Sequence, residues 1–344
     1  MQGPVIENLE SLSVSKGKSS LLAAGYLNID SDNGEETAKI SMLELNLATN
    51  SYTILNTENM PTTDISELVL ISAQNPESPL LAYLSTSSET EETIFEFISS
   101  LKQSNSVLNS QPSYSVVVAQ GCEPSLGHIR FSPLSPLVIV KTDKAALNLY
   151  FVDKQKATVG QQVQFTSSAK GEHFLDFAAM KAGDERILVV VACKTSLLLA
   201  ELPVKGAFPK TLTPKTTLKL LETKERTRFI QFSKDNKYLL VATANENKSQ
   251  DLGGSKSSKF VISMSLYTIT GANTPQNAIS LNQETPNSDL FLNPHNFTGS
   301  VDLFKLFIVP ASPIPNSGLL FLLFPSASTA PQYFELHLNK ESKT

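Results

Sequence analysis

The feature that most constrains the fold is a repeated pair of short apolar segments, the first alternating in polarity and the second nearly continuous. The three clearest copies cover 129–153, 174–192 and 229–267. Phe131 and Phe232 occupy equivalent positions in the first and third of these copies, 101 residues apart, so two periods of about 50 residues separate them. Amphipathic helical periodicity is hard to find along the chain. Short strands joined by polar turns at this spacing predict an all-β fold.

Fainter copies of the same unit flank the clear ones, at 12–24, 68–83 and 306–324. In each copy the second segment is almost free of polar residues, as a propeller requires where neighbouring sheets cover both faces of a strand. The interval between about 230 and 305 leaves room for a degenerate seventh unit, and the terminal strands can also complete a shared blade. We therefore predict one β-propeller domain of six or seven blades over 1–344, with a tandem pair of β-sandwiches as the alternative.

Composition excludes several classes of protein. Charged residues make up 18% and hydrophobic residues 41% of the chain, which excludes wholesale disorder. The two cysteines, Cys122 and Cys193, exclude a disulfide framework and a multi-cysteine zinc site. No apolar run approaches the length of a membrane-spanning helix, and residues 1–20 lack the pattern of a signal peptide. These features predict a cytoplasmic protein with no membrane span in this chain.

Four polar segments are longer than the repeat requires and are predicted to be long loops. They cover 26–39, 203–217, 244–259 and 271–298. Loops held by a rigid framework are where binding residues collect.

Charge is distributed unevenly along the chain. Residues 1–100 hold 15 acidic and 3 basic side chains, a net of −12, so the remainder carries +7 within a total of −5. Seven basic and two acidic residues lie within 205–228. Opposite charges in separate regions predict two surfaces that contact other proteins. The predicted partner-binding residues are Asn28, Asp30, Asp32, Asn33, Glu35, Glu36, Lys219, Lys224 and Arg226. The basic stretch has little aromatic interleaving, so no nucleic-acid partner is expected.

The central units resemble WD-repeat propellers. The segment 129–140 is followed by Tyr150-Phe151-Val152-Asp153, in which Val152 occupies the place of the WD tryptophan. Gly127-His128 is similar to the Gly-His pair of that family, although it directly abuts the strand. The chain contains no Trp, so the resemblance is to a degenerate WD repeat. This resemblance implies a non-enzymatic scaffold or adaptor for protein–protein interactions.

The first unit also resembles that of the propeller exchange factor for the Sar-type GTPase of COPII vesicle coats. Leu21-Leu22-Ala23-Ala24-Gly25 leads into the polar loop 26–39, and the strand resumes at 40–45. The resemblance implies that loop 26–39 engages a small GTPase at the cytosolic face of the endoplasmic reticulum and holds a monovalent cation. The loop carries only Gly34, whereas the family's loop is rich in glycine.

Catalytic motifs are absent from the sequence. The four histidines show no metal-binding spacing, and no phosphate-binding loop, dinucleotide fingerprint or nucleophile elbow occurs. Asp30 to Glu35 resembles the start of a calcium loop, but Gly34 is misplaced and Ser41 stands where glutamate is required. No cofactor is otherwise expected. The remaining alternative is a cation-dependent propeller hydrolase, with Asp143, His173, Asp176 and Asn245 as candidate ligands.

Overall fold

The computed structural model describes most of the strands and some of the connections between them. The described residues are 5–11, 20–30, 36–46, 51–61, 64–72, 80–86, 90, 92–98, 114–120, 125–129, 137–153, 158–167, 173–220, 227–233, 236–247, 259–272, 277–283, 297–298, 305–308, 319–324 and 332–336. Within these ranges the secondary structure consists of strands and turns. The predicted all-β class is confirmed.

The strands of the first half form three sheets, named A to C in chain order. Sheet A contains β1 (Val5–Ser11), β2 (Ser20–Asp30), β3 (Glu36–Asn46) and β4 (Ser51–Pro61). Sheet B contains β5 (Asp64–Ser72), β6 (Leu80–Thr86), β7 (Glu92–Ile98) and β8 (Tyr114–Gln120). Sheet C contains β9 (Ser125–Ile129), β10 (Leu137–Asp143), β11 (Ala146–Asp153), β12 (Thr158–Thr166) and the short β16 (Thr211–Leu212), which joins β12 in parallel.

The second half supplies sheets D to F. Sheet D contains β13 (Phe174–Ala182), β14 (Arg186–Cys193), β15 (Ser196–Pro203) and β17 (Thr216–Lys219). Sheet E contains β18 (Thr227–Phe232), β19 (Tyr238–Asn247), β20 (Lys259–Thr270), β21 (Ser280–Gln283) and β22 (Phe297–Thr298). Sheet F contains β23 (Lys305–Ile308), β24 (Leu319–Phe324) and β25 (Gln332–Leu336).

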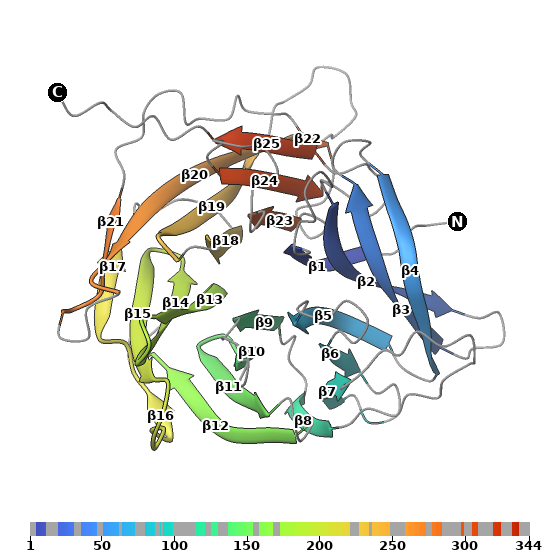
Figure 1. The fold of residues 1–344 in the computed structure, drawn as a ribbon, viewed down its shortest axis with the longest axis horizontal. Coiled ribbons are helices and arrows are strands. Elements are labelled where there is room, and N and C mark those ends of the chain that lie inside the picture. Colours follow the sequence, from blue (N-terminus) through green and yellow to red (C-terminus); the bar gives the residue numbers. More distant parts are fainter. Residues whose placement is uncertain are drawn as a thin grey trace.

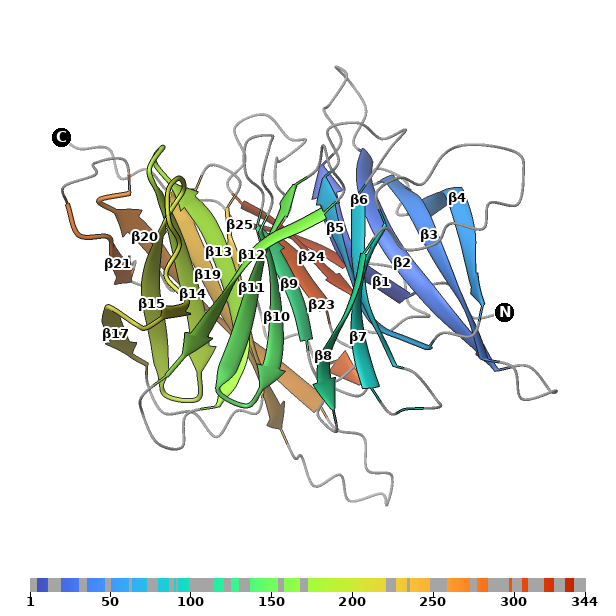
Figure 2. The same cartoon turned by 90° about the horizontal axis from the view of Figure 1, so that it is seen from below.

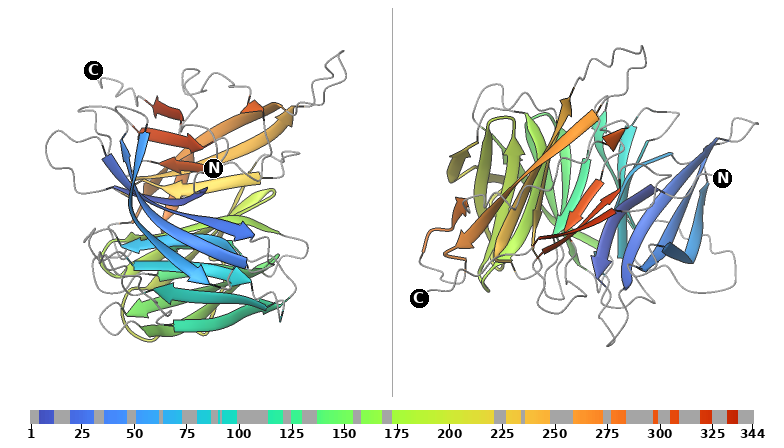
Figure 3. Two further views of the ribbon diagram at one scale, coloured as in Figure 1. Left: turned by 90° about the vertical axis from the view of Figure 1, so that its right-hand side faces the viewer. Right: turned by 90° about the horizontal axis from the view of Figure 1, so that it is seen from above.

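The six described sheets follow one another around a common centre, in the manner of propeller blades (Figure 1). Apart from the added β16 and β22, each sheet takes its strands in chain order, from the common centre outward. Consecutive sheets touch through their innermost strands, as β9 contacts β5, β13 contacts β9, β18 contacts β13 and β23 contacts β18. Seen from the side, the sheets stand face against face with their strands steeply inclined (Figures 2 and 3).

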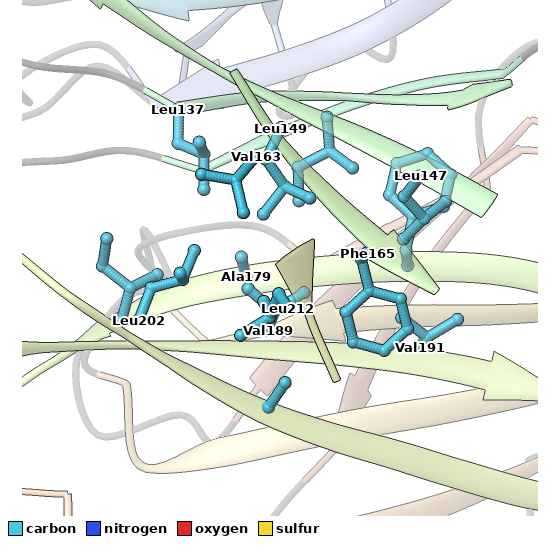
Figure 4. Packing of buried hydrophobic residues seen from close by; sticks show 14 of the residues in the cluster. Leu137, Leu147, Leu149, Val163, Phe165, Ala179, Val189, Val191, Leu202 and Leu212 are labelled. Carbon is cyan, nitrogen blue, oxygen red and sulfur yellow. The ribbon is translucent and has the colours of Figure 1, made fainter. Parts of the chain in front are cut away.

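The hydrophobic core is divided into layers between neighbouring sheets. Between sheets C and D, apolar side chains from both sides form one cluster, shown in Figure 4 with Leu149 and Phe165 facing Val189 and Val191. Val190 points to the opposite face of β14 and belongs to the next layer, between sheets D and E. Similar layers lie between sheets A and B and between sheets B and C. A strand covered on both faces must be apolar at nearly every position, which explains the unbroken run in β14.

Polar side chains tie the inner strands of one sheet to the next. In sheet D, Asp176 accepts hydrogen bonds from the backbone N–H of Phe177 at 2.9 Å and from that of Ile230 in sheet E at 2.6 Å. From β14, the guanidinium of Arg186 donates to the carbonyl oxygens of Gly271 at 2.7 Å and Asn277 at 2.9 Å, in the connection between β20 and β21. A backbone donor or acceptor away from water needs a partner, and at these junctions a side chain from the adjacent sheet supplies it.

Several segments predicted to be loops are partly strand. β2 continues to Asp30 and β3 starts at Glu36, in register with each other to the end, so only 31–35 separates them. The segment 203–217 contains β16 and the start of β17, which extend sheets C and D. These short strands are hard to recognise in the sequence because they contain polar residues and prolines. A strand at the outer side of a sheet is covered on one face only and therefore needs few apolar residues.

The tie made by Asp176 generates a stability prediction. Asp176→Ala leaves the part-buried N–H of Ile230 without its acceptor and lowers the free energy of unfolding by about 1–3 kcal/mol. Asp184→Ala is the matched control, because this 96% exposed carboxylate pairs with Lys181 at the surface and its removal should leave the unfolding midpoint close to that of the wild-type protein. Urea unfolding of both variants measures the difference, and equal effects would show that Asp176 does not join the sheets.

Candidate functional site

The acidic surface predicted from the sequence is only partly within the described residues. Asn28 lies on β2, where its Nδ2 donates to the carbonyl oxygen of Ile65 at 2.8 Å and its Oδ1 accepts from the N–H of Ile65 at 3.1 Å. Asn28 thus ties sheet A to sheet B. Asp30 ends β2 and Glu36 begins β3, directly opposite each other. Asp32, Asn33 and Glu35 lie outside the described residues, so the predicted cation and partner contacts of this loop stay predictions.

The basic surface is also only partly described. Lys219 is exposed at the end of β17, whereas Lys224 and Arg226 lie outside the described residues. The acidic and basic regions belong to sheets A and D, which lie on opposite sides of the ring in Figure 1. The structure therefore does not bring them together into one site.

The candidate ligands of a hydrolase cation are not gathered either. Asp176 is engaged between sheets D and E, as described above, and Asp143 accepts from the N–H of Lys144 in an exposed turn at 2.6 Å. His173 is exposed, and nothing is described of the Asn245 side chain. Across the described residues, no group of three or more His, Cys, Asp or Glu side chains is placed to hold a metal ion.

A partly buried polar cluster lies between sheets A and B. Tyr83, on β6 and fully buried, stands opposite Glu96 of β7 and is hydrogen-bonded to its carboxylate. Ser85 donates to Glu96 Oε2 at 2.9 Å. Glu58, on β4 and 8% exposed, approaches from sheet A. Two carboxylates thus share the neighbourhood of one phenol.

In this cluster the hydroxyl group of Tyr83 keeps its proton. Burial raises the pKa of the Tyr83 hydroxyl far above its ordinary value, and the negative charges of Glu96 and Glu58 raise it further. Tyr83 is therefore a hydrogen-bond donor at neutral pH and not a base or a nucleophile. The hydrogen bonds of Tyr83 and Ser85 to Glu96 hold these side chains in place beside the A–B layer, which is a structural role.

An exposed apolar strand edge distinguishes sheet A. Tyr52, Ile54 and Leu55 of β4 are 47%, 51% and 39% exposed, and they are three of the four large apolar side chains exposed in the described part of the chain. Tyr52 pairs with Leu45 and Ile54 with Leu43, while Leu55 is the extra residue of a β-bulge. Since Leu43 and Leu45 are buried, Tyr52 and Ile54 continue a buried apolar face out to the open edge of the sheet.

β4 differs from the short outer strands of sheets D and E. It is 11 residues long, with β3 as its described partner, and its half from Ser51 to Thr57 contains no charge and no proline. β17 and β21 have only four residues each, and β17 ends in Lys219. Sequence reasoning missed the β4 edge, although its signal is visible as Tyr52-Thr53-Ile54-Leu55 without a flanking charge. We take this edge, defined as Ser51–Thr57, as the candidate functional site.

Comparison with known proteins gives matches among solved structures alone. No protein-family model and no curated protein matches the chain. It is similar to the β-propeller domain of the Trilobed protease from Pyrococcus furiosus, with 10% identity, a TM-score of 0.37 and coverage of 99% of this chain and 97% of that one. It is also similar to prolyl oligopeptidase B from Galerina marginata, with 8% identity and a TM-score of 0.35 for the apo protein. This match covers 88% of the present chain, which spans only 37% of the oligopeptidase.

These comparisons correct the predicted function. The similar structures are propeller domains of peptidases. The sequence had predicted a WD-repeat-like scaffold, with a GTPase exchange factor or a cation-dependent hydrolase as alternatives. That functional prediction is wrong, and neither the WD-repeat nor the COPII resemblance gains support. The propeller part of the resemblance is supported. Among the described residues no helix is long and apolar enough to cross a membrane.

The buried phenol generates a prediction on alkaline stability. The folded-state pKa of Tyr83 is raised above the unfolded value of about 10, so the folded state loses stability as the pH rises above that value, by about 1.4 kcal/mol per pH unit. Tyr83→Phe removes this loss, and its free energy of unfolding falls less steeply above pH 10. Absorbance at the tyrosinate band shows one tyrosine fewer ionising in the unfolding transition.

Tyr52→Phe is the matched control, because it removes an exposed hydroxyl and keeps the alkaline slope of the wild-type protein. A Tyr83→Phe variant with an unchanged slope would contradict the buried donor role.

Proposed function

We propose that this chain is a hydrolase-related, six-bladed propeller domain that captures an extended polypeptide segment at the β4 edge. The observation that carries the proposal is the long, uncharged and apolar half of β4 on the outside of sheet A. The peptidase identity of the similar structures decides nothing by itself, but it agrees with a polypeptide ligand. Sheets A to F supply the six blades of this proposal.

The backbone of the β4 edge selects the class of ligand. Along an outer strand, every second residue directs its N–H and C=O away from the sheet, and only another extended backbone can pair with them in series. Among the described residues no strand lies on the outer side of β4. Strand addition there would give sheet A a fifth strand, as β16 does for sheet C.

The side chains of the β4 edge select the character of that segment. Tyr52 and Ile54 continue the face of Leu43 and Leu45, so an added strand would place apolar side chains beside them. On the other face, Thr53 pairs with Glu44 and favours polar neighbours. The ligand expected is therefore a strand that alternates between apolar and polar residues.

Binding of a defined peptide tests this function. A short, fluorescently labelled peptide of alternating Val and Thr, with a terminal Lys at each end for solubility, is titrated with the protein. Ile54→Lys places a charge beside the added strand and should weaken binding at least tenfold, which is about 1.4 kcal/mol. N-methylation of alternate amides in the peptide should abolish binding, because it removes the main-chain donors.

Val117→Lys is the matched control. Val117 is 48% exposed on β8, the outer strand of sheet B, and its replacement leaves the affinity unchanged if β4 is the binding edge. Equal weakening by both lysine variants, or full binding of the N-methylated peptide, would refute the proposal.

A further inference from the structure

A second surface of distinct chemistry lies on the outer side of sheets C and D. Between 194 and 220 the described chain carries five lysines, all exposed, and a single acidic residue, Glu201. The lysines are Lys194, Lys205, Lys210, Lys215 and Lys219, and we call them the lysine row. The sequence had indicated a basic segment from 205 onward, but it gave no reason to include Lys194.

The strand register brings the two ends of the segment 194–220 together. Lys219 pairs with Ser196 in the β15–β17 ladder, and the N–H of Leu220 donates to the carbonyl oxygen of Thr195 at 2.7 Å. Lys194 and Lys219 therefore lie at the same end of sheet D. The carbonyl oxygen of Lys210 accepts from the N–H of Gln164, which attaches the other part of the row to β12 of sheet C.

The carboxylate of Glu201 is already engaged. Glu201 is 16% exposed, and its Oε2 lies 3.3 Å from Arg186 Nη1 and 3.5 Å from Lys215 Nζ. Arg186 is itself part of the junction between sheets D and E. Glu201 is therefore paired with Arg186 and Lys215, whereas Lys210 and Lys219 are exposed and Lys205 is exposed with the carboxylate of Asp184 in its neighbourhood.

We propose that the lysine row binds an acidic polypeptide segment in extended conformation. Charge complementarity selects an anionic ligand, and β17 provides a strand edge on which Thr216, Thr217 and Lys219 are exposed, so that a backbone can pair beside the lysines. A single-stranded nucleic acid fits less well. The one aromatic residue within 194–220, Phe208, is stacked on Phe151 with ring centroids 4.1 Å apart and offers no platform for a base.

The test uses the full chain and a short, labelled peptide of alternating Glu and Thr. Fluorescence anisotropy should show binding that weakens as NaCl rises from about 0.05 to 0.3 M. The double variant Lys210→Glu/Lys219→Glu should lower the affinity at least tenfold. Both positions are exposed, and circular dichroism verifies that the variant remains folded.

The matched control reverses two exposed lysines outside the row, Lys39 on β3 and Lys144 in the β10–β11 turn. Lys39→Glu/Lys144→Glu changes the net charge equally and should leave the affinity close to that of the wild-type protein. Equal loss in both double variants would show a general charge effect and overturn the proposal. Tighter binding of a thymidine oligonucleotide of equal charge would overturn it in favour of a nucleic-acid site.

Discussion

The fold depends on middle strands that are covered by neighbouring sheets on both faces. In β14, Val189 belongs to the layer shared with sheet C and Val190 to the layer shared with sheet E. Each such strand contributes to two cores at once, so no sheet has a complete core of its own. Stability then comes from adding neighbours, as in other repeat architectures, and the loss of one layer weakens the two sheets beside it. The outer strands escape this demand, and variation between the sheets collects there.

Polar side chains between neighbouring sheets have a different role. The layers are apolar, so backbone groups at the junctions between sheets take their hydrogen-bond partners from Asn28, Asp176 and Arg186. These residue types are also those that bind metals and substrates, which is why Asp176 fitted a cation site on sequence grounds. The same holds for Tyr83, Glu96 and Glu58, which combine acid and phenol chemistry in a place that the A–B layer closes off. In the described part of the chain, Asn28, Asp176 and Arg186 therefore join neighbouring sheets.

Whether a strand could be predicted from the sequence depends on whether one or both of its faces are covered. Strands such as β6, β10 and β14 were predicted because two covered faces leave an unmistakable apolar run. The short β16 and β17 were not, because one covered face leaves a mixed pattern with lysine and proline. Tyr52 and Ile54 have the residue types of a core, and only the position of β4 at the edge of sheet A shows that they are exposed. That Lys194 and Lys219 are neighbours follows from the β15–β17 register, which cannot be read from the sequence alone.

The two halves of β4 differ, although both belong to the outer strand of sheet A. Natural edges are protected against pairing by inward charges, prolines and bulges. The second half of β4 carries such protection, with Glu58 pointing into the A–B layer and Pro61 at its end. The first half, Ser51–Thr57, contains the bulge at Leu55, but it carries exposed Tyr52 and Ile54 and has neither a charge nor a proline. A need only to avoid aggregation would apply equally to both halves. The contrast within one strand is what an edge reserved for a ligand strand would require.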